Sequence, residues 1–443
     1  MTIKIQQIIP ALDYPEEGVP VMAAEAWMHG PTKPRHAKRK DEIPDIDVSL
    51  SNISNVFDFV EVNPAIYVKN AHDLKKHDLR DVDAFIVDPG DPNILPMSSV
   101  MYELFSTRKP VLPPWDNWGY AWRGKHITGW AKILGYYSFV PIGFKDVKNV
   151  LQAVRGIKFI RSLNILYIGD IPSNSVNTDT DPIRLYEKFG CTITRIPFHE
   201  YANEVENADK KRAKEIAEKW LLSFNMMDNT ETKVEKYASI YVAIKNLMKK
   251  YETNALTVDC AYLPSIELVP CVTASLISDE GFPFGCEGDT NQLISAAMMM
   301  GVSGQASLMG NLFENALHKD IENNQIVINH DVLPPSMACE GCKINFRDFH
   351  EKQKGSTLYA DLKKEIVTIG GMDFDSSEMW LSKGKVAWTE DTVHCRISIG
   401  FDVENAKRIA KEAIGDHQVT VFGDYVDSIQ IMCDFLGIKT RNI

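Results

Sequence analysis

The chain has 443 residues, of which 44% are hydrophobic and 24% charged, a composition typical of folded globular proteins and not of disordered ones. One hydrophobic core rarely grows beyond about 250–300 residues, so this length predicts more than one domain. The formal net charge of −12 disfavours a nucleic-acid partner, because phosphate binding requires a basic surface.

The sequence predicts a cytoplasmic protein with no membrane partner. It contains no run of about 18 apolar residues that could form a transmembrane helix. Residues 1–10 are typical of a β-strand and lack the long apolar region and cleavage site of a signal peptide. The eight cysteines are scattered and several lie in apolar runs, which favours reduced, buried thiols over a disulfide framework.

Two predicted domains, residues 1–160 and 161–330, alternate strand-like and helix-like stretches, which is typical of a parallel, doubly wound sheet. The expected strands are residues 3–9, 57–62, 84–87, 164–169, 191–196, 255–260, 282–286 and 305–309. The expected helices are residues 182–189, 208–222, 232–251, 271–278 and 291–301. The fold class expected for this part is therefore α/β, with two Rossmann-like domains.

The third predicted domain, residues 331–443, has a different pattern. Residues 366–369, 385–388 and 394–400 are short strand-like stretches separated by polar turns, and residues 426–436 are expected to form a final helix. Short strands of this kind are typical of antiparallel structure. We expect a β-rich, barrel-like C-terminal domain.

The most informative motif is Cys286-Glu287-Gly288-Asp289, at the carboxyl end of an expected strand and just before a helix. Ligands bind at that end of the strands in open α/β sheets. A carboxylate there can be an oxygen ligand for a divalent ion or a general base. Asp289 can equally cap the helix by accepting a backbone N–H. For Glu287 the sequence context favours a functional role, because an acid between a cysteine and a glycine at the end of a strand packs poorly.

Three further polar residues lie at the ends of strand-like runs. Asn311 follows Met309-Gly310, His330 follows the apolar run 326–328, and His417 precedes the run 419–422. A lone histidine in such a place is more often structural than a ligand. Spacing alone does not show whether these residues meet Glu287 in space.

These motifs resemble those of the L-fucose and L-arabinose isomerases. The Glu287 motif, residues 308–311, the His330 segment, residues 393–396 and residues 417–424 occur in the order seen in that family, and the resemblance covers residues 255–430. It implies an aldose–ketose isomerase that holds a divalent ion, usually Mn²⁺, with a glutamate, a second acid and a histidine. The ion would polarise a sugar carbonyl while a carboxylate moves a proton between C1 and C2 through an enediol.

Carried over by position, the resemblance implies a metal site and a catalytic set in this chain. Glu287 matches the first metal-binding glutamate, and Asn311 occupies the place of the second acid. His417 matches the C-terminal histidine ligand, and His330 matches a histidine that binds metal in the arabinose branch. The implied ligands are thus Glu287, Asn311, His417 and His330, and the implied catalytic residues are Glu287, Asp289 and Asn311.

The sequence departs from the family pattern at Asn311, which cannot act as a base and brings no charge to a metal. Glu287 could then be the sole base, or Asp289 or Glu314 could take over the second role. A third alternative is a non-catalytic sugar-binding or regulatory protein on the same fold. Asp416 stands where relatives often have a second histidine, and both changes indicate a divergent branch with its own substrate.

The N-terminal segment between Trp115 and Lys125 bears on that substrate. In the resembled family an N-terminal domain can close over a neighbouring subunit's site, which implies a homo-oligomer with its active site near a subunit interface. Trp115 and Trp118 could stack on a sugar, and Arg123 or Lys125 could bind an anionic group, so an acidic or sulfonated sugar is one expectation. An aromatic anchor at a subunit interface is the alternative.

Two other classes are disfavoured. Cys339-Glu340-Gly341-Cys342 matches half of a zinc site, but no second pair of ligands follows at zinc-finger spacing. Gly169-Asp170-Ile171-Pro172 lacks the glycine-rich fingerprint of a dinucleotide-dependent oxidoreductase.

Overall fold

The structure is a computed structural model that describes residues 1–10, 49–87, 96–115, 121–169, 181–392 and 395–443. Its contacts divide the chain into two units, Met1–Lys158 and Phe159–Ile443. Each unit is described by itself. Among the described residues, no helix has the length and apolar character needed to cross a membrane.

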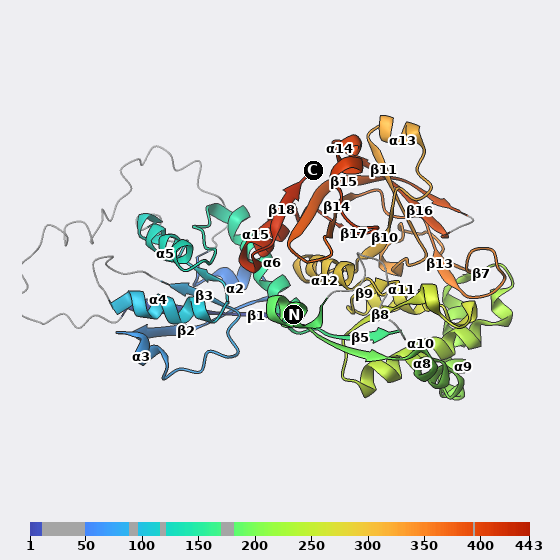
Figure 1. The fold of residues 1–443 in the computed structure, drawn as a ribbon, viewed down its shortest axis with the longest axis horizontal. Coiled ribbons are helices and arrows are strands. Elements are labelled where there is room, and N and C mark those ends of the chain that lie inside the picture. Colours follow the sequence, from blue (N-terminus) through green and yellow to red (C-terminus); the bar gives the residue numbers. More distant parts are fainter. Residues whose placement is uncertain (11–48, 88–95, 116–120, 170–180, 393–394) are drawn as a thin grey trace, which may run out of the picture. The chain divides into compact units, whose positions relative to one another are not determined.

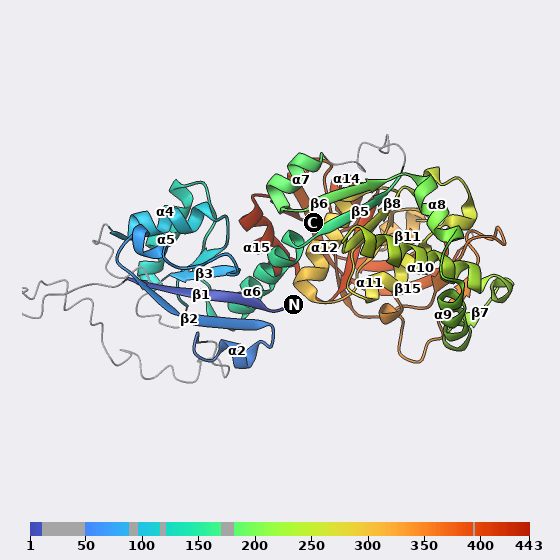
Figure 2. The same cartoon turned by 90° about the horizontal axis from the view of Figure 1, so that it is seen from below.

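The first unit is built on a four-stranded, all-parallel sheet with the order β2-β1-β3-β4. Parallel sheets are covered on both faces, so their strands are apolar runs, and every residue of β3 is buried. Phe85 and Val87 pack on α4 and α5, which cover one face of the sheet (Figure 2). Its elements are β1 (Ile3–Pro10), α2 (Ile53–Val56), β2 (Val60–Val68), α3 (Ala71–Leu74), β3 (Ala84–Val87), α4 (Pro96–Ser106), β4 (Val111–Leu112), α5 (Ala121–Ile133) and α6 (Gly143–Arg161).

The second unit begins with another parallel sheet, of order β6-β5-β8-β9, flanked by helices. Asp181 caps α7 through its side chain and Gly190 ends the helix in a left-handed conformation, so the sequence itself sets both ends. The elements of this part are β5 (Asn164–Ile168), α7 (Pro182–Phe189), β6 (Thr192–Ile196), α8 (Phe198–Glu206), α9 (Lys210–Ser223), β7 (Asn225–Met226), α10 (Val234–Lys250), β8 (Ala255–Val258), α11 (Cys271–Asp279), β9 (Phe284–Cys286) and α12 (Thr290–Ser303).

A closed barrel follows in the same unit. Its strands run in the order β14-β17-β10-β11-β16-β15, and β15 pairs back with β14. The interior is filled by apolar side chains that include Ile328, Trp380 and Phe401. The elements of this part are β10 (Leu308–Leu312), α13 (His318–Glu322), β11 (Gln325–His330), β12 (Asn345–Arg347), β13 (Thr357–Tyr359), β14 (Ile366–Met372), β15 (Glu378–Asp391), β16 (Ile397–Val403), α14 (Ala406–Glu412), β17 (His417–Phe422), α15 (Val426–Leu436) and β18 (Lys439–Asn442).

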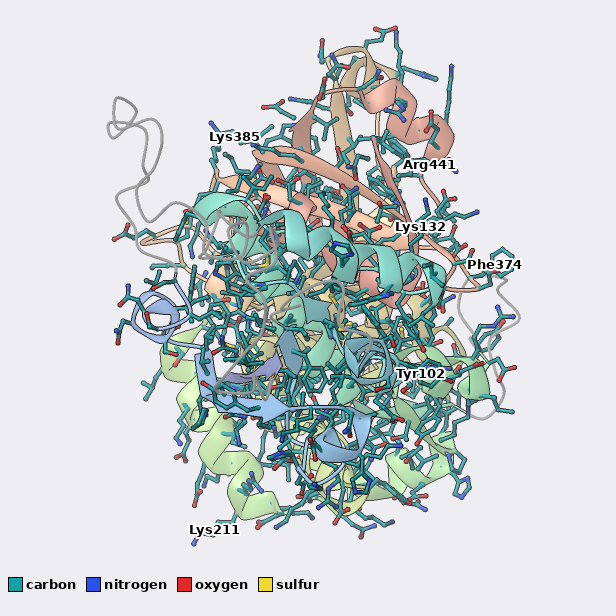
Figure 3. All side chains as sticks on the ribbon, turned by 90° about the vertical axis from the view of Figure 1, so that its left-hand side faces the viewer. Tyr102, Lys132, Lys211, Phe374, Lys385 and Arg441 are labelled. Atoms are coloured by element: carbon teal, nitrogen blue, oxygen red, sulfur yellow. A yellow bond between two sulfur atoms is a disulfide. The ribbon has the colours of Figure 1, made fainter. Side chains whose placement is uncertain are left out.

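Helix α12 connects the parallel sheet to the barrel. It packs against β8 and β9 on one side and against β14 and β17 on the other, and lies between the two layers in Figure 1. On the outside of the barrel, β18 pairs with β15, and Arg441 of β18, which is labelled in Figure 3, forms an ion pair with Glu378 of β15. The sheet, α12 and the barrel therefore form one continuous body.

The predicted fold class is confirmed, because two parallel-sheet α/β parts precede a closed β-barrel. The domain boundaries at residues 160 and 330 stay a prediction, and the barrel already includes β10 and β11, which lie before residue 331. The expectation of reduced thiols is wrong for one pair. Cys339 and Cys342 form a disulfide, whereas the other six cysteines are free.

Candidate active site

A cavity of about 470 Å³ opens in the second unit, where the carboxyl end of β9 meets one end of the barrel. This volume lies within the usual range of small-molecule sites. Acidic side chains dominate its described lining, which contains one histidine and neither lysine nor arginine. The lining residues are Glu287, Asn311, Leu312, Phe313, Glu314, Asp331, Phe349, His350, Cys395 and Asp416.

The turn after β9 places Glu287 at this cavity. Glu287 and Gly288 both adopt a left-handed backbone conformation, with φ of 52° and 75°, so the chain reverses at once and α12 begins at Thr290. For a residue other than glycine this conformation is strained by roughly 1–3 kcal/mol, and such strain clusters at functional sites. A Cβ at Gly288 would lie 2.6 Å from the Tyr167 hydroxyl, so only glycine fits there.

Asp289 is fully buried and uses both of its carboxylate oxygens. Oδ1 accepts a hydrogen bond from the backbone N–H of Gln292 at 2.9 Å, which confirms the interpretation of Asp289 as a helix cap. Oδ2 lies 3.1 Å from Nδ1 of His417. Asp289 therefore starts α12 and also fixes the orientation of the His417 ring.

His417 lies between Glu287 and His330. Its Nε2 lies 3.9 Å from Oε2 of Glu287, and its ring stacks on that of His330 with 5.4 Å between centroids. His417 is the first residue of β17 and pairs opposite Asn311 of β10 in the antiparallel ladder. The barrel register thus brings together the four residues that the sequence proposed as ligands.

The electrostatics of the two histidines differ. Burial alone would lower the pKa of His417, but the hydrogen bond that its ring donates to Asp289 and the charges of Asp289 and Glu287 raise it above its usual value. Burial and the neighbouring His417 lower the pKa of His330 to about 3. His330 is therefore neutral near pH 7, which is the form that binds a metal.

The side chains present fit a divalent ion. Nε2 of His330 and Nε2 of His417 are both buried without a hydrogen-bond partner among the described residues, although a buried polar atom normally has one. Potential ligand atoms of Cys260, Cys286 and Glu287 lie within 4.8 Å of one another, and so do those of His330, Asp331 and Cys395. Glu287 adds a carboxylate that is 44% exposed. Imidazole and carboxylate donors of this kind suit first-row divalent metals.

The proposed substrate-binding residues belong to the first unit. Trp115 is buried, with 4% of its surface exposed, and Lys125 is exposed on α5. Trp118 lies outside the described residues, and so does the side chain of Arg123. Their role in binding a sugar stays a prediction.

Sequence reasoning missed three residues in or near the site and named Cys395 only as part of the motif at residues 393–396. Asp331 directly follows His330 but was not singled out, and His350 lies in a loop without periodicity. Asp259 follows β8, which pairs with the strand that ends just before Glu287, and its position after an apolar strand was a usable signal. Burial and the charge of Glu287 raise the pKa of Asp259 to about 6.

The central segment is similar to a known protein family. Residues 164–304, which include Glu287 and Asp289, match the family described as the L-arabinose isomerase central domain. Over this segment the chain is similar to the L-arabinose isomerases, as the resemblance in the sequence predicts.

Named relatives agree with this assignment at low identity. The sulfoquinovose isomerase of Alkalicoccus urumqiensis is 26% identical over 188 residues, which cover 41% of each chain. The L-arabinose isomerase of Acidothermus cellulolyticus is 22% identical over 187 residues, 40% of this chain and 37% of the relative. That of Thermotoga maritima is 23% identical over 220 residues, 48% of this chain and 43% of the relative. The chain spans less than half the length of the curated relatives it matches.

Proposed function

We propose that this chain is an aldose–ketose isomerase that acts on a monosaccharide and uses Mn²⁺ or a similar divalent ion. One observation carries the proposal: Glu287 lies beside two buried histidines whose Nε2 atoms have no hydrogen-bond partner among the described residues. The names of the relatives, sulfoquinovose isomerase and L-arabinose isomerase, support the same reaction type. The enzyme would be cytoplasmic and homo-oligomeric, with its site near a subunit interface.

In this proposal Glu287, His417 and His330 hold the ion, and the amide oxygen of Asn311 is a neutral ligand. When bound, the ion supplies Lewis acidity that makes the C–H next to the sugar carbonyl easier to deprotonate. Glu287 is the base that carries the proton between C2 and C1, because it is the exposed carboxylate of the cluster. Asp289 acts through His417, whose ring it orients.

The charge of the cavity bears on the substrate. Four carboxylates line it, which favours a cation and neutral hydroxyl groups over an anionic ligand in that place. We propose that an acidic or sulfonated sugar would bind with its hydroxyl groups in this cavity. Its anionic group would then contact residues such as Arg123 or Lys125 from the N-terminal domain of a neighbouring subunit.

A non-catalytic sugar-binding protein is the second candidate, and Asn311 is the observation that favours it. This amide lines the cavity where the resembled family has its second acid. An amide cannot exchange a proton with a carbon acid. A binder would therefore hold a sugar without exchanging its C2 proton.

The test combines metal content with proton exchange. The protein is dialysed against a chelator and reloaded with Mn²⁺, and aldoses that include acidic and sulfonated ones are screened for C2 exchange in deuterated water. We expect Mn²⁺-dependent exchange with ketose formation, lost together with metal binding in Glu287→Gln. The exposed Glu404→Gln is the matched control and should retain both. Sugar binding without exchange would select the non-catalytic candidate.

A further inference from the structure

A second pair of residues on the cavity wall is arranged as an acid–base dyad. His350 and Asp331 both line the cavity, and Nε2 of His350 lies 2.7 Å from Oδ2 of Asp331. Asp331 is 1% exposed. A buried carboxylate bonded to a histidine fixes the tautomer and the orientation of the imidazole, which is the arrangement that general acid–base catalysis requires.

Arg396 contacts Asp331 directly and the loop of His350 through Asp348. Its backbone N–H donates to Oδ1 of Asp331 at 2.9 Å. Its guanidinium is 2% exposed, forms an ion pair with Asp348 and donates from Nε to the Asp348 carbonyl at 3.1 Å. Asp348 precedes His350 by two residues. The buried Arg396, just before β16, therefore contacts both the carboxylate of Asp331 and the loop that carries His350.

The loop that carries His350 is held in a costly backbone conformation. His350 has a φ of 51°, in the left-handed region that favours glycine, and its ring stacks on Phe349 with centroids 3.7 Å apart. Strain of this kind persists only where the surrounding contacts compensate for its cost, and it is enriched at functional sites. Together with the contacts of Arg396, these features fix the ring at the cavity wall.

We propose that His350 is the acid–base group that transfers the hydroxyl protons of the sugar, and that Asp331 positions it. The inference rests on the proposed isomerase function and assigns to His350 a proton transfer that Asn311 cannot perform. Glu287 reaches the cavity from the turn after β9, Asp331 from the segment after β11, and His350 from the loop between β12 and β13. The two proton transfers are thereby divided between two groups.

The proposed proton transfers balance as follows. Glu287 takes the proton from C2, the electron pair of that bond forms the C1=C2 double bond, and protonated His350 gives its proton to O1, which yields the enediol. Neutral His350 then takes the proton from O2, the C2=O2 bond forms, and Glu287 returns its proton to C1. One hydrogen has moved from C2 to C1 and one from O2 to O1, with no oxidant or reductant.

The experiment uses the full, Mn²⁺-loaded chain and compares His350→Gln, His350→Ala and Asp331→Asn with wild type, with the exposed His199→Gln as the matched control. We expect kcat to fall by about 10²–10⁴-fold in each of the three variants, with KM and metal content changed by less than about threefold in the two His350 variants. Added imidazole should restore part of the rate of His350→Ala, and should not restore that of Glu287→Gln. Three substitutions keep the test decisive if one of them unfolds.

The outcomes separate the two proposals. If wild type exchanges C2 protons but His350→Gln keeps kcat within about threefold of wild type, the dyad is refuted and the isomerase stands. A loss of kcat that accompanies loss of metal, or that imidazole does not restore in His350→Ala, would also overturn the acid–base role. If wild type exchanges no proton with any sugar, the isomerase proposal fails and the role of His350 fails with it.

Discussion

Replacing Asp259 with asparagine should stabilise the metal-free protein at neutral pH. This carboxyl is 1% exposed, and its pKa is raised to about 6 because of burial and the charge of Glu287. In the unfolded chain it is about 3.9, so the folded state binds the proton more tightly and stability falls as the pH rises from about 4 to about 6. A shift of about two pKa units means that the ionised carboxylate destabilises the folded state by about 3 kcal/mol, and this destabilisation is complete above about pH 6. Asparagine removes this cost, so the thermal midpoint should rise on the order of 5 °C at neutral pH and change little at about pH 4.

Two comparisons make this expectation specific. The exposed Glu404→Gln, an acid-to-amide change of the same kind, should show no such pH-dependent gain. In a Glu287→Gln background the gain from Asp259→Asn should shrink, because the neighbouring charge is gone, and a double-mutant cycle measures that coupling. An equal effect of Asp259→Asn at both pH values would refute the electrostatic reasoning.

Three further predictions concern stability. Asp289→Ala should cost about 2–4 kcal/mol in chemical denaturation, because it removes a helix cap and leaves Nδ1 of the buried His417 without its partner. Arg396→Met should cost about 3–5 kcal/mol in the same assay, because the carboxylate of Asp348 then stays buried without its ion pair. The pKa of His330 is lowered to about 3, so the unfolded chain binds the proton more tightly and stability should fall as the pH drops below about 6.5. His330→Asn should flatten that acid limb in melts from about pH 7 to about pH 5.

Much of the fold could be predicted because local signals agree with the tertiary context. Residues 182–189 and 426–436 are helices as predicted, since a left-handed glycine ends each of them and Asp181 caps the first. Strand β15 is far longer than the predicted residues 385–388, because its first half gains β14 and β18 as partners, which no local pattern reveals. Strand β2 begins later than predicted, since an edge strand with several exposed residues and a proline has a weak apolar pattern.

The site could be predicted only in part. Glu287 and His417 were identified through motifs, but their proximity depends on the pairing of β10 with β17, which places Asn311 opposite His417 across a long sequence separation. The dyad of His350 and Asp331 could not be predicted. Both residues lie outside regular elements, and a buried arginine fixes their arrangement through contacts that sequence periodicity does not encode.

The turn after β9 has a consequence for recognising related enzymes. The fold requires glycine at position 288, because the Tyr167 hydroxyl leaves no room for a side chain. It also requires Asp289, which caps α12 and orients the His417 ring. Neither requirement depends on the conversion of a sugar. Glu287 alone is free of such packing demands, because its side chain is 44% exposed at the cavity. A homologue that has lost its chemistry should therefore keep the glycine and the aspartate while the residue before them drifts. Under the proposed function, the residue at position 287 would indicate whether a homologue is active, whereas Gly288 and Asp289 would indicate only a shared fold.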